Sequence, residues 1–180
     1  YAYESIKYGL QDFMIAGGAE ELSVSEAVMF DVLYATSINN QNPKQTPAPF
    51  DKNRDGLVIG EGAATLILED LETARSRGAK IYAELLGYGA NSDGEHMTAP
   101  AVSGMKRVME LALEDANLPP EAIGYLNAHG TATEVGDIAE SEAINKVFGD
   151  RIPISSLKGH FGHTMGACGA LETWMTLQMA

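Results

Sequence analysis

Two patterns of apolar residues alternate along the chain. Short runs rich in Val, Ile, Leu and small residues are separated by longer segments in which apolar residues recur every three or four positions. Short continuous runs are typical of strands buried on both faces, and the longer spacing is typical of helices that bury one face. The alternation therefore predicts an α/β fold with largely buried sheets. The predicted strands are 13–17, 63–68, 83–89, 125–128 and 152–155.

The clearest helical periods lie in the second half of the chain. Residues 102–117 keep steps of three and four between apolar side chains, and Pro119 and Pro120 prevent the helix from continuing. Residues 171–179 repeat this spacing, so their apolar side chains are predicted to belong to the core. Residues 1–8 already resemble a helix interior, without a start methionine or a capping residue. We therefore expect an interior piece of a longer protein.

The charge balance and the single cysteine narrow the possible functions. The 180 residues carry 12 Lys and Arg against 25 Asp and Glu, a net charge of −13 that is spread along the chain. Nucleic acid is not an expected partner, because neutralising its phosphates needs clustered positive charge. No apolar run approaches the roughly 20 residues of a membrane-spanning helix, so no membrane partner is expected. One cysteine cannot form an internal disulfide, which suits a reducing, cytoplasmic setting.

Residues 39–56 form a polar stretch of 18 residues with three prolines. This composition predicts a long surface loop, and such loops are often functional. Residues 51–56 match the first half of an EF-hand calcium loop, but the twelfth position, which should supply a bidentate carboxylate, is Gly62. We therefore expect a turn in which Asx side chains hydrogen-bond the backbone.

Two histidines in glycine-rich frames give the strongest chemical signal. His129 follows the predicted strand 125–128 in Asn-Ala-His-Gly-Thr, and His163 lies 34 residues later in Gly-His-Thr-Met-Gly-Ala. Lys158 follows the predicted strand 152–155 and precedes His163 by five residues. Because ligands of open α/β sheets bind at the carboxyl ends of the strands, loops after neighbouring strands can meet in one pocket. We predict that these three side chains form an active site.

The chemistry that suits two neutral histidines is stabilisation of an oxyanion. Two imidazole N–H donors aimed at one thioester carbonyl would stabilise the enolate that forms when a malonyl group loses carbon dioxide. One such preorganised donor contributes about 3–4 kcal/mol. Small residues after His163 let the next helix approach closely, and the partial positive charge at its N-terminus favours an anion there.

Four neighbouring side chains are candidate supporting residues. Thr131 and Thr133 offer hydroxyl donors, or they cap the following helix. Asp137 and Glu140 share one face of that helix, where they could form an N-cap and a capping box. Alternatively, or in addition, Glu140 pairs with Lys158 and orients its ammonium group.

Two other interpretations concern the residues around His163. His160 and His163 have the H-x-x-H spacing of metal ligands, but no cysteine cluster or fixed carboxylate completes a zinc site, so no metal is expected. Cys168 lies beside the histidine loop as a candidate nucleophile. A small apolar residue at a tight helix contact is the better interpretation of its Ala-Cys-Gly setting.

The chain contains a series of short glycine-rich or charged motifs. They are Ala-Gly-Gly-Ala-Glu-Glu at 16–21, Pro-Phe-Asp at 49–51, Arg-Asp-Gly at 54–56, Gly-Glu-Gly-Ala at 60–63, Leu-Asn-Ala-His-Gly-Thr at 126–131, Gly-Asp at 136–137 and Gly-His-Thr-Met-Gly-Ala at 162–167. In order and spacing, these motifs resemble those of the β-ketoacyl-acyl-carrier-protein synthases, the condensing enzymes of the thiolase superfamily. The resemblance runs nearly from end to end, and residues 87–94 and 125–137 are most similar to the bacterial elongating enzymes.

The resemblance implies a thiolase-like α/β fold. Two related halves, each a mixed five-stranded sheet sandwiched by helices, would be partly present here. The seam would lie near residues 81–84, so that residues 1–82 belong to the N-terminal half and residues 83–180 to the C-terminal half. The resemblance also implies a homodimer, with residues 13–17 as a candidate interface strand.

The implied activity is acyl transfer with decarboxylative Claisen condensation in fatty acid elongation. A cysteine takes an acyl chain from acyl carrier protein, malonyl-carrier-protein loses CO₂, and the resulting carbanion attacks the acyl thioester. No cofactor is implied beyond the carrier's pantetheine. The family's catalytic positions correspond here to His129, His163 and Lys158. Glu140 matches the acidic partner of that lysine, and Thr131 and Thr133 match threonines that contact the phosphopantetheine arm.

The departures from the family pattern also matter. The family's nucleophilic cysteine would lie about ten residues before Tyr1, so this polypeptide alone is expected not to condense anything. Cys168 occupies a position where the family usually has Ala or Ser. A polyketide ketosynthase and a non-catalytic chain-length subunit remain alternatives, although the retained histidines and Lys158 count against the second. A degradative thiolase fits poorly because thiolases use a cysteine as base in the second half, and an inert α/β domain is the remaining possibility.

Overall fold

The computed structural model describes residues 1–96 and 98–179. Its helices and strands follow one another as α1 (Ala2–Lys7), β1 (Phe13–Glu20), α2 (Val24–Val32), η1 (Pro43–Gln45), β2 (Gly62–Glu69), α3 (Leu71–Ser76), α4 (Val102–Ala116), η2 (Pro120–Ala122), β3 (Leu126–Asn127), α5 (Glu134–Phe148), β4 (Ile154–Ser155), α6 (Lys158–Phe161), η3 (Met165–Ala167) and α7 (Cys168–Met179). Within these residues, none of the helices combines the length and the apolar content needed to cross a bilayer.

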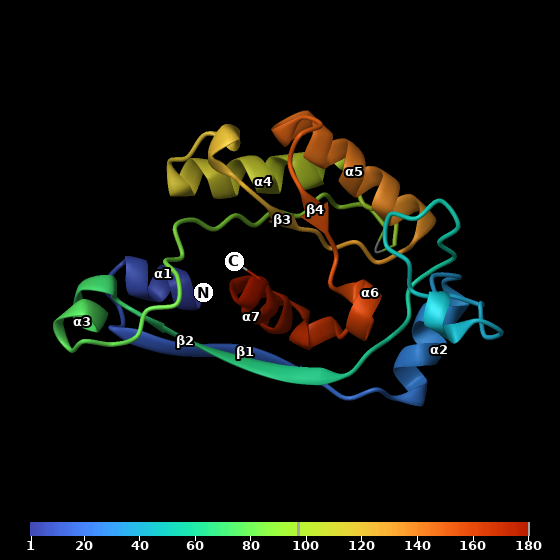
Figure 1. The fold of residues 1–180 in the computed structure, drawn as a ribbon, viewed down its shortest axis with the longest axis horizontal. Coiled ribbons are helices and arrows are strands. Elements are labelled where there is room, and N and C mark those ends of the chain that lie inside the picture. The colour runs from blue at the N-terminus through green and yellow to red at the C-terminus, as the bar shows by residue number, and fades with distance from the viewer. Residues whose placement is uncertain (97, 180) are drawn as a thin grey trace.

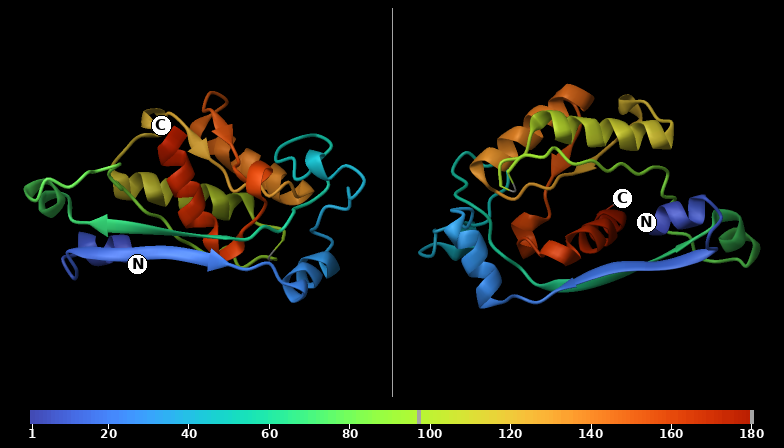
Figure 2. Two further views of the ribbon diagram at one scale, coloured as in Figure 1. Left: turned by 60° about the horizontal axis from the view of Figure 1, so that its bottom comes forward. Right: turned by 180° about the vertical axis from the view of Figure 1, so that it is seen from behind.

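The elements stack in layers (Figure 1). Helices α4 and α5 lie side by side on the outside, above the short strands β3 and β4. Helix α7 lies in the middle, and the long β1–β2 ribbon covers its other side, as both views in Figure 2 show. Helices and strands thus form the mixed arrangement that the apolar patterns predict.

The long β1–β2 ribbon is antiparallel, with Phe13 opposite Glu69 and Glu20 opposite Gly62. Its residues alternate between exposed and half-buried, because only one face packs against α7. On the other face, Ile15 and Ile67 are 66% and 72% exposed. The prediction of largely buried sheets is therefore wrong for this ribbon, since no described element covers its outer face.

The second sheet is the parallel pair β3–β4, in which Leu126 lies opposite Ile154. Both strands are shorter than predicted. The predicted strand 83–89 forms no ladder with any described residue. It runs against α4 instead, where a β-carbon on Gly87 would lie 2.5 Å from the carbonyl oxygen of Ala112. This close approach explains the glycine in an otherwise strand-like segment.

The predicted helix 102–117 is confirmed as α4. It ends at Asn117, whose φ of 52° is left-handed and whose backbone N–H bonds the carbonyl oxygen of Glu114. Asparagine tolerates this conformation, which explains why the helix stops before the two prolines.

The predicted helix near the C-terminus is confirmed as α7, but the prediction that its apolar residues belong to the core is wrong for several of them. Trp174, Met175 and Met179 are 38%, 41% and 55% exposed. Trp174 packs edge-on against Tyr82, with 5.7 Å between the ring centroids. The periodicity identifies the apolar face of the helix, whereas burial requires a neighbour to cover it.

The polar stretch 39–56 is a loop with one short 3₁₀ turn, as predicted. The backbone N–H of Asn53 donates to Asp51 Oδ1 at 2.7 Å, which is the expected Asx turn. The Asp55 carboxylate accepts hydrogen bonds from the Ser37 hydroxyl and the Ile38 N–H, at 2.8 and 3.0 Å. These aspartates therefore organise the loop.

Candidate active site

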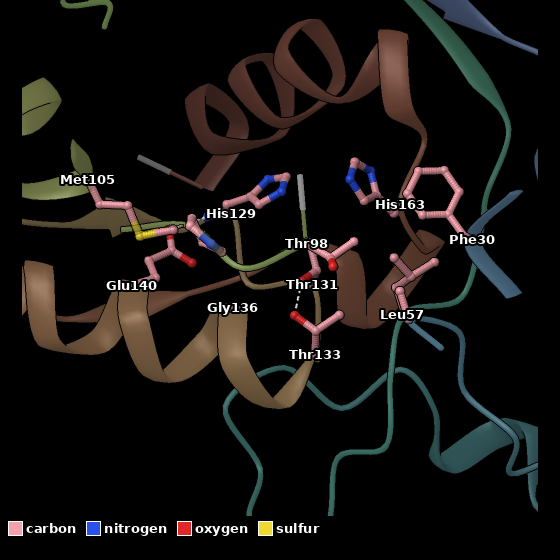
Figure 3. Close-up of a pocket in the computed structure, with 12 residues that line it drawn as sticks. Phe30, Leu57, Thr98, Met105, His129, Thr131, Thr133, Gly136, Glu140 and His163 are labelled. Atoms are coloured by element: carbon pink, nitrogen blue, oxygen red, sulfur yellow. Dashed lines mark hydrogen bonds between the residues drawn. The ribbon is translucent and has the colours of Figure 1, made fainter. Parts of the chain in front are cut away.

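The structure brings His129 and His163 together from separate loops. Their ring centroids are 5.0 Å apart, and the planes meet at 85°. Both rings line one pocket of about 100 Å³, shown in Figure 3. Its other lining residues are Phe30, Ala35, Leu57, Thr98, Pro100, Met105, Thr131, Thr133, Gly136 and Glu140.

The backbone of the His129 loop is fixed by Glu140. Its two carboxylate oxygens accept the N–H groups of His129 and Gly130, each at 2.7 Å. Ser156 donates its hydroxyl to the carbonyl oxygen of Gly130 at 2.8 Å. Gly130 has a φ of +41°, and a β-carbon there would lie 2.5 Å from Ser156 Cβ. The glycine after the histidine is therefore required by both conformation and space.

The predicted capping box of Asp137 and Glu140 is wrong. Thr133 occupies the N-cap of α5 without a side-chain capping bond, and Asp137 lies in the first turn. The Asp137 carboxylate instead accepts the N–H groups of Phe50 and Ala132, at 2.7 and 3.1 Å. Asp137 therefore bonds backbone N–H groups of the loop 39–56 and of the histidine loop, and it does not cap its own helix.

Burial raises the pKa of both Asp137 and Glu140, and their backbone N–H donors oppose that shift. Arg54 further supports Asp137, with its Nε 3.4 Å from the carboxylate. Both acids therefore act as buried acceptors that hold the backbone of the site in place.

His163 is held through both its backbone and its ring. Its N–H donates to the carbonyl oxygen of Val58 at 2.8 Å, and its carbonyl oxygen accepts the Gly60 N–H at 2.9 Å. The backbone N–H of Met165 donates to His163 Nδ1 at 3.2 Å. Since Nδ1 accepts this bond, the proton of the neutral ring belongs on Nε2.

Lys158 lies beside the pocket and does not line it. The side chain is 1% exposed, and its Nζ lies 2.6 Å from Glu172 Oε1. The predicted pairing of Lys158 with Glu140 is therefore corrected: the direct partner is Glu172, because the Glu140 oxygens are engaged by the His129 loop.

Glu172 is the site residue that the sequence analysis missed. It lies on α7 and is 8% exposed, and its Oε2 accepts the Asn127 amide at 3.2 Å. The sequence did offer a signal, because Glu172 is an acid within the largely apolar stretch 171–175. Acids are almost never fully buried unless they are paired, so this position indicates a buried partner.

The environment keeps both imidazoles neutral. Burial, and then the charge of Lys158, lowers the pKa of His129 to about 3 and that of His163 to about 4. His129 is exposed on its pocket side, yet protein atoms surround the rest of the ring and desolvate an imidazolium. Near pH 7 both rings can therefore donate N–H groups without carrying charge.

Thr131 and Thr133 lie below the histidines, and their hydroxyl oxygens are 2.9 Å apart (Figure 3). Both line the pocket, so their hydroxyls can meet a polar group that enters it. Among the residues that the structure describes, no three His, Cys, Asp or Glu side chains are arranged to hold a metal ion.

Comparisons with known proteins identify the family of this chain. The family model described as "Beta-ketoacyl synthase, C-terminal domain" matches residues 82–180, and "Beta-ketoacyl synthase, N-terminal domain" matches residues 1–74. The chain therefore belongs to the β-ketoacyl synthase family.

Curated relatives include the 3-oxoacyl-[acyl-carrier-protein] synthases 1 of Haemophilus influenzae and Escherichia coli K12. They are 50% and 46% identical to the chain over 99% of its length. The chain spans 44% of the length of either relative.

Solved structures show the same fold. A β-ketoacyl synthase from Burkholderia phymatum STM815 is 61% identical with a TM-score of 0.98, over 99% of this chain and 44% of that one. A type II PKS ketosynthase in complex with its acyl-carrier protein is 40% identical with a TM-score of 0.91, over 98% of this chain and 45% of that one. The predicted thiolase-like α/β fold is confirmed.

Proposed function

We propose that this chain is the central part of a 3-oxoacyl-acyl-carrier-protein synthase that elongates fatty acids. The observation that carries the proposal is the pair of neutral imidazoles, 5.0 Å apart in one pocket, with the buried Lys158 near enough for its charge to lower the pKa of both. The identity of 50% to a synthase of this kind supports it.

The proposed chemical step uses the two rings as hydrogen-bond donors. The thioester oxygen of malonyl-carrier-protein lies between the N–H groups of His129 and His163. The bond to the carboxylate breaks, CO₂ leaves, and the electron pair passes into an enolate whose oxygen both rings stabilise. Each donor contributes about 3–4 kcal/mol at the transition state. The enolate carbon then attacks the acyl thioester on a cysteine outside this chain, and the thiolate leaves as the new C–C bond forms.

The surrounding residues have proposed roles in this step. Lys158 acts through its charge, which disfavours imidazolium at both histidines. Glu140 and Asp137 hold the His129 loop, and the hydroxyls of Thr131 and Thr133 bind the amide groups of the phosphopantetheine arm. The reaction needs no metal and no bound cofactor.

The proposal also covers the domain boundary, the oligomeric state and the partner. The match to the N-terminal family model ends at residue 74, and the match to the C-terminal model begins at residue 82. This favours a seam near 81–84 between halves 1–82 and 83–180. A homodimer with residues 13–17 at its interface suits the exposed apolar face of β1. Acyl carrier protein is the proposed partner, as the ketosynthase complex suggests by similarity, and the acidic chain with one cysteine suits the cytoplasm.

A polyketide ketosynthase is the second candidate, favoured by the 40% identical type II PKS structure. The higher identity to the fatty acid enzymes supports elongation. Product analysis with malonyl-carrier-protein separates the two, because one condensation per cycle indicates an elongating synthase and repeated condensation indicates a polyketide enzyme.

The test of the proposed function is His163→Ala in the full-length protein. The variant should lose malonyl decarboxylation by about 10²–10³-fold, since one oxyanion donor is removed. Acyl loading onto the cysteine should largely persist, because loading does not form the malonyl enolate. Decarboxylation at the parent rate would remove the enolate assignment.

A further inference from the structure

The cysteine that follows the histidine motif touches the ring of His163. Cys168 is the first residue of α7 and is 8% exposed. Its Sγ lies 3.1 Å from His163 Nδ1 and 3.4 Å from the hydroxyl of Thr164, which is itself 1% exposed. The family resemblance accounts for the histidine but leaves this thiol unexplained, because Ala or Ser usually stands at that position.

The direction of the thiol contact follows from the other bonds of the ring. The Met165 N–H already donates to His163 Nδ1, so Nδ1 carries no proton in the neutral ring. Two atoms without a proton between them would repel, and the thiol is therefore the donor. The Thr164 hydroxyl in turn donates to Sγ, so that sulfur is both donor and acceptor.

We propose that Cys168 is a positioning residue for His163. Its S–H and the N–H of Met165 together hold the ring in the tautomer that keeps the proton on Nε2, and they fix its rotation toward the pocket. The catalytic consequence rests on the proposed function, whereas the tautomer and its thiol bond do not.

The thiol bond exists only while Nδ1 is unprotonated, and this condition gives it a measurable effect. Protonation of His163 would set the new Nδ1–H against the Met165 N–H and would end the donation from the thiol, so removal of the thiol makes protonation easier. The charged or titratable groups facing His163 from the packed elements are Lys158 on α6 and His129 after β3. Neither changes when Cys168 is replaced, so a shift in the pKa of His163 reports the thiol itself.

The experiment uses the full-length protein with ¹⁵N-labelled histidine. The parent is compared with Cys168→Ala, which has no donor, and with Cys168→Ser, which restores one. His163→Ala identifies the resonance. In the parent and the serine variant, Nδ1 should have the shift of an unprotonated, hydrogen-bonded nitrogen. In the alanine variant, Nδ1 should move toward the value of a less hydrogen-bonded nitrogen, and the pKa should rise by about half a unit, a threefold change that suits one weak bond.

Three results would overturn the proposal. They are a protonated Nδ1 in the parent, an alanine variant indistinguishable from the parent, and equal shifts in the alanine and serine variants, which would indicate packing of the sulfur in place of donation. Thermal unfolding of each variant confirms that it is folded.

Kinetics then separate this proposal from the proposed function. The alanine variant should lose about threefold in the kcat of malonyl decarboxylation with KM unchanged, and the serine variant should stay near the parent. If the parent does not decarboxylate malonyl-carrier-protein, the proposed function fails while the ¹⁵N result stands. If the parent decarboxylates and the alanine variant matches it in rate and in Nδ1 shift, the positioning role fails alone.

Discussion

His129 and His163 face the same pocket but are held by different means. For His129, hydrogen bonds to Glu140 and Ser156 fix the backbone of its loop, and the ring meets His163 edge-on. His163 has backbone bonds to the segment 58–60 and a ring bond from Met165. One histidine therefore depends on a buried carboxylate, and the other depends on the segment 58–60 and on its own turn. Changes near the two rings should therefore have separable effects.

The largest expected effect on stability comes from replacing Glu172, whose carboxylate pairs with the buried ammonium group of Lys158. Glu172→Leu leaves Lys158 buried without its partner, and breaking a buried pair typically costs about 3–5 kcal/mol. The free energy of unfolding, from denaturant titration, should fall by that amount. Glu142→Ala is the matched control, because it removes one partner of an exposed ion pair with Lys146. The expected change in its unfolding free energy is below about 0.5 kcal/mol. Similar small changes in both variants would mean that Lys158 does not depend on Glu172.

Glu140→Ala should disturb the His129 side alone. The change leaves the N–H groups of His129 and Gly130 without acceptors, and each unsatisfied buried group costs about 1–3 kcal/mol. We expect a loss of about 2–4 kcal/mol in unfolding free energy and a changed ¹⁵N ring signal for His129. Glu140→Gln keeps one acceptor and should lose less. An equal disturbance of the His163 ring signal would contradict the separation.

A smaller effect should appear in the dependence of stability on pH. The folded pKa of His163, about 4, lies below the ordinary 6.5, so the unfolded chain binds more protons between these values. The stability from the neutral ring is therefore complete above pH 6.5 and is lost as the pH falls toward 4, with a slope below about 1.4 kcal/mol per pH unit.

Burial raises the pKa of Glu140, so this carboxyl group increases stability as the pH falls and opposes the effect of His163. The prediction therefore concerns the difference between the parent and a variant that lacks His163. The unfolding free energy of the parent should fall more steeply below pH 6.5 than that of His163→Gln. Parallel curves would show that the fold does not favour the neutral ring.

The sequence correctly predicted those features of the fold that are determined by residues close together in the chain. Helix α4, the helical nature of α7 and the Asx turn at Asp51 follow from periodicity and from turn chemistry. The meeting of His129 and His163 was predicted because both motifs follow strands and match a known order. The roles of Lys158, Thr131 and Thr133 in catalysis stay predictions.

The rest depends on partners that are distant in sequence. The capping box failed because Phe50 and Ala132 supply better donors to Asp137 than its own helix does. The partner of Lys158 was missed because it is Glu172, which lies 14 residues later in the sequence. The turn formed by α6 and η3 brings its carboxylate back to the ammonium group. Exposure of Trp174 and Ile15 could not be read from periodicity, which identifies a face but does not show what covers it.

The central claim is that two uncharged imidazoles share one pocket, and the ionisation of the rings tests it most directly. In the full-length protein labelled with ¹⁵N-histidine, neither His129 nor His163 should titrate between pH 8 and pH 5. A titration of His129 or His163 near pH 6.5 would contradict the account, because a charged ring could not serve as the neutral donor that it requires.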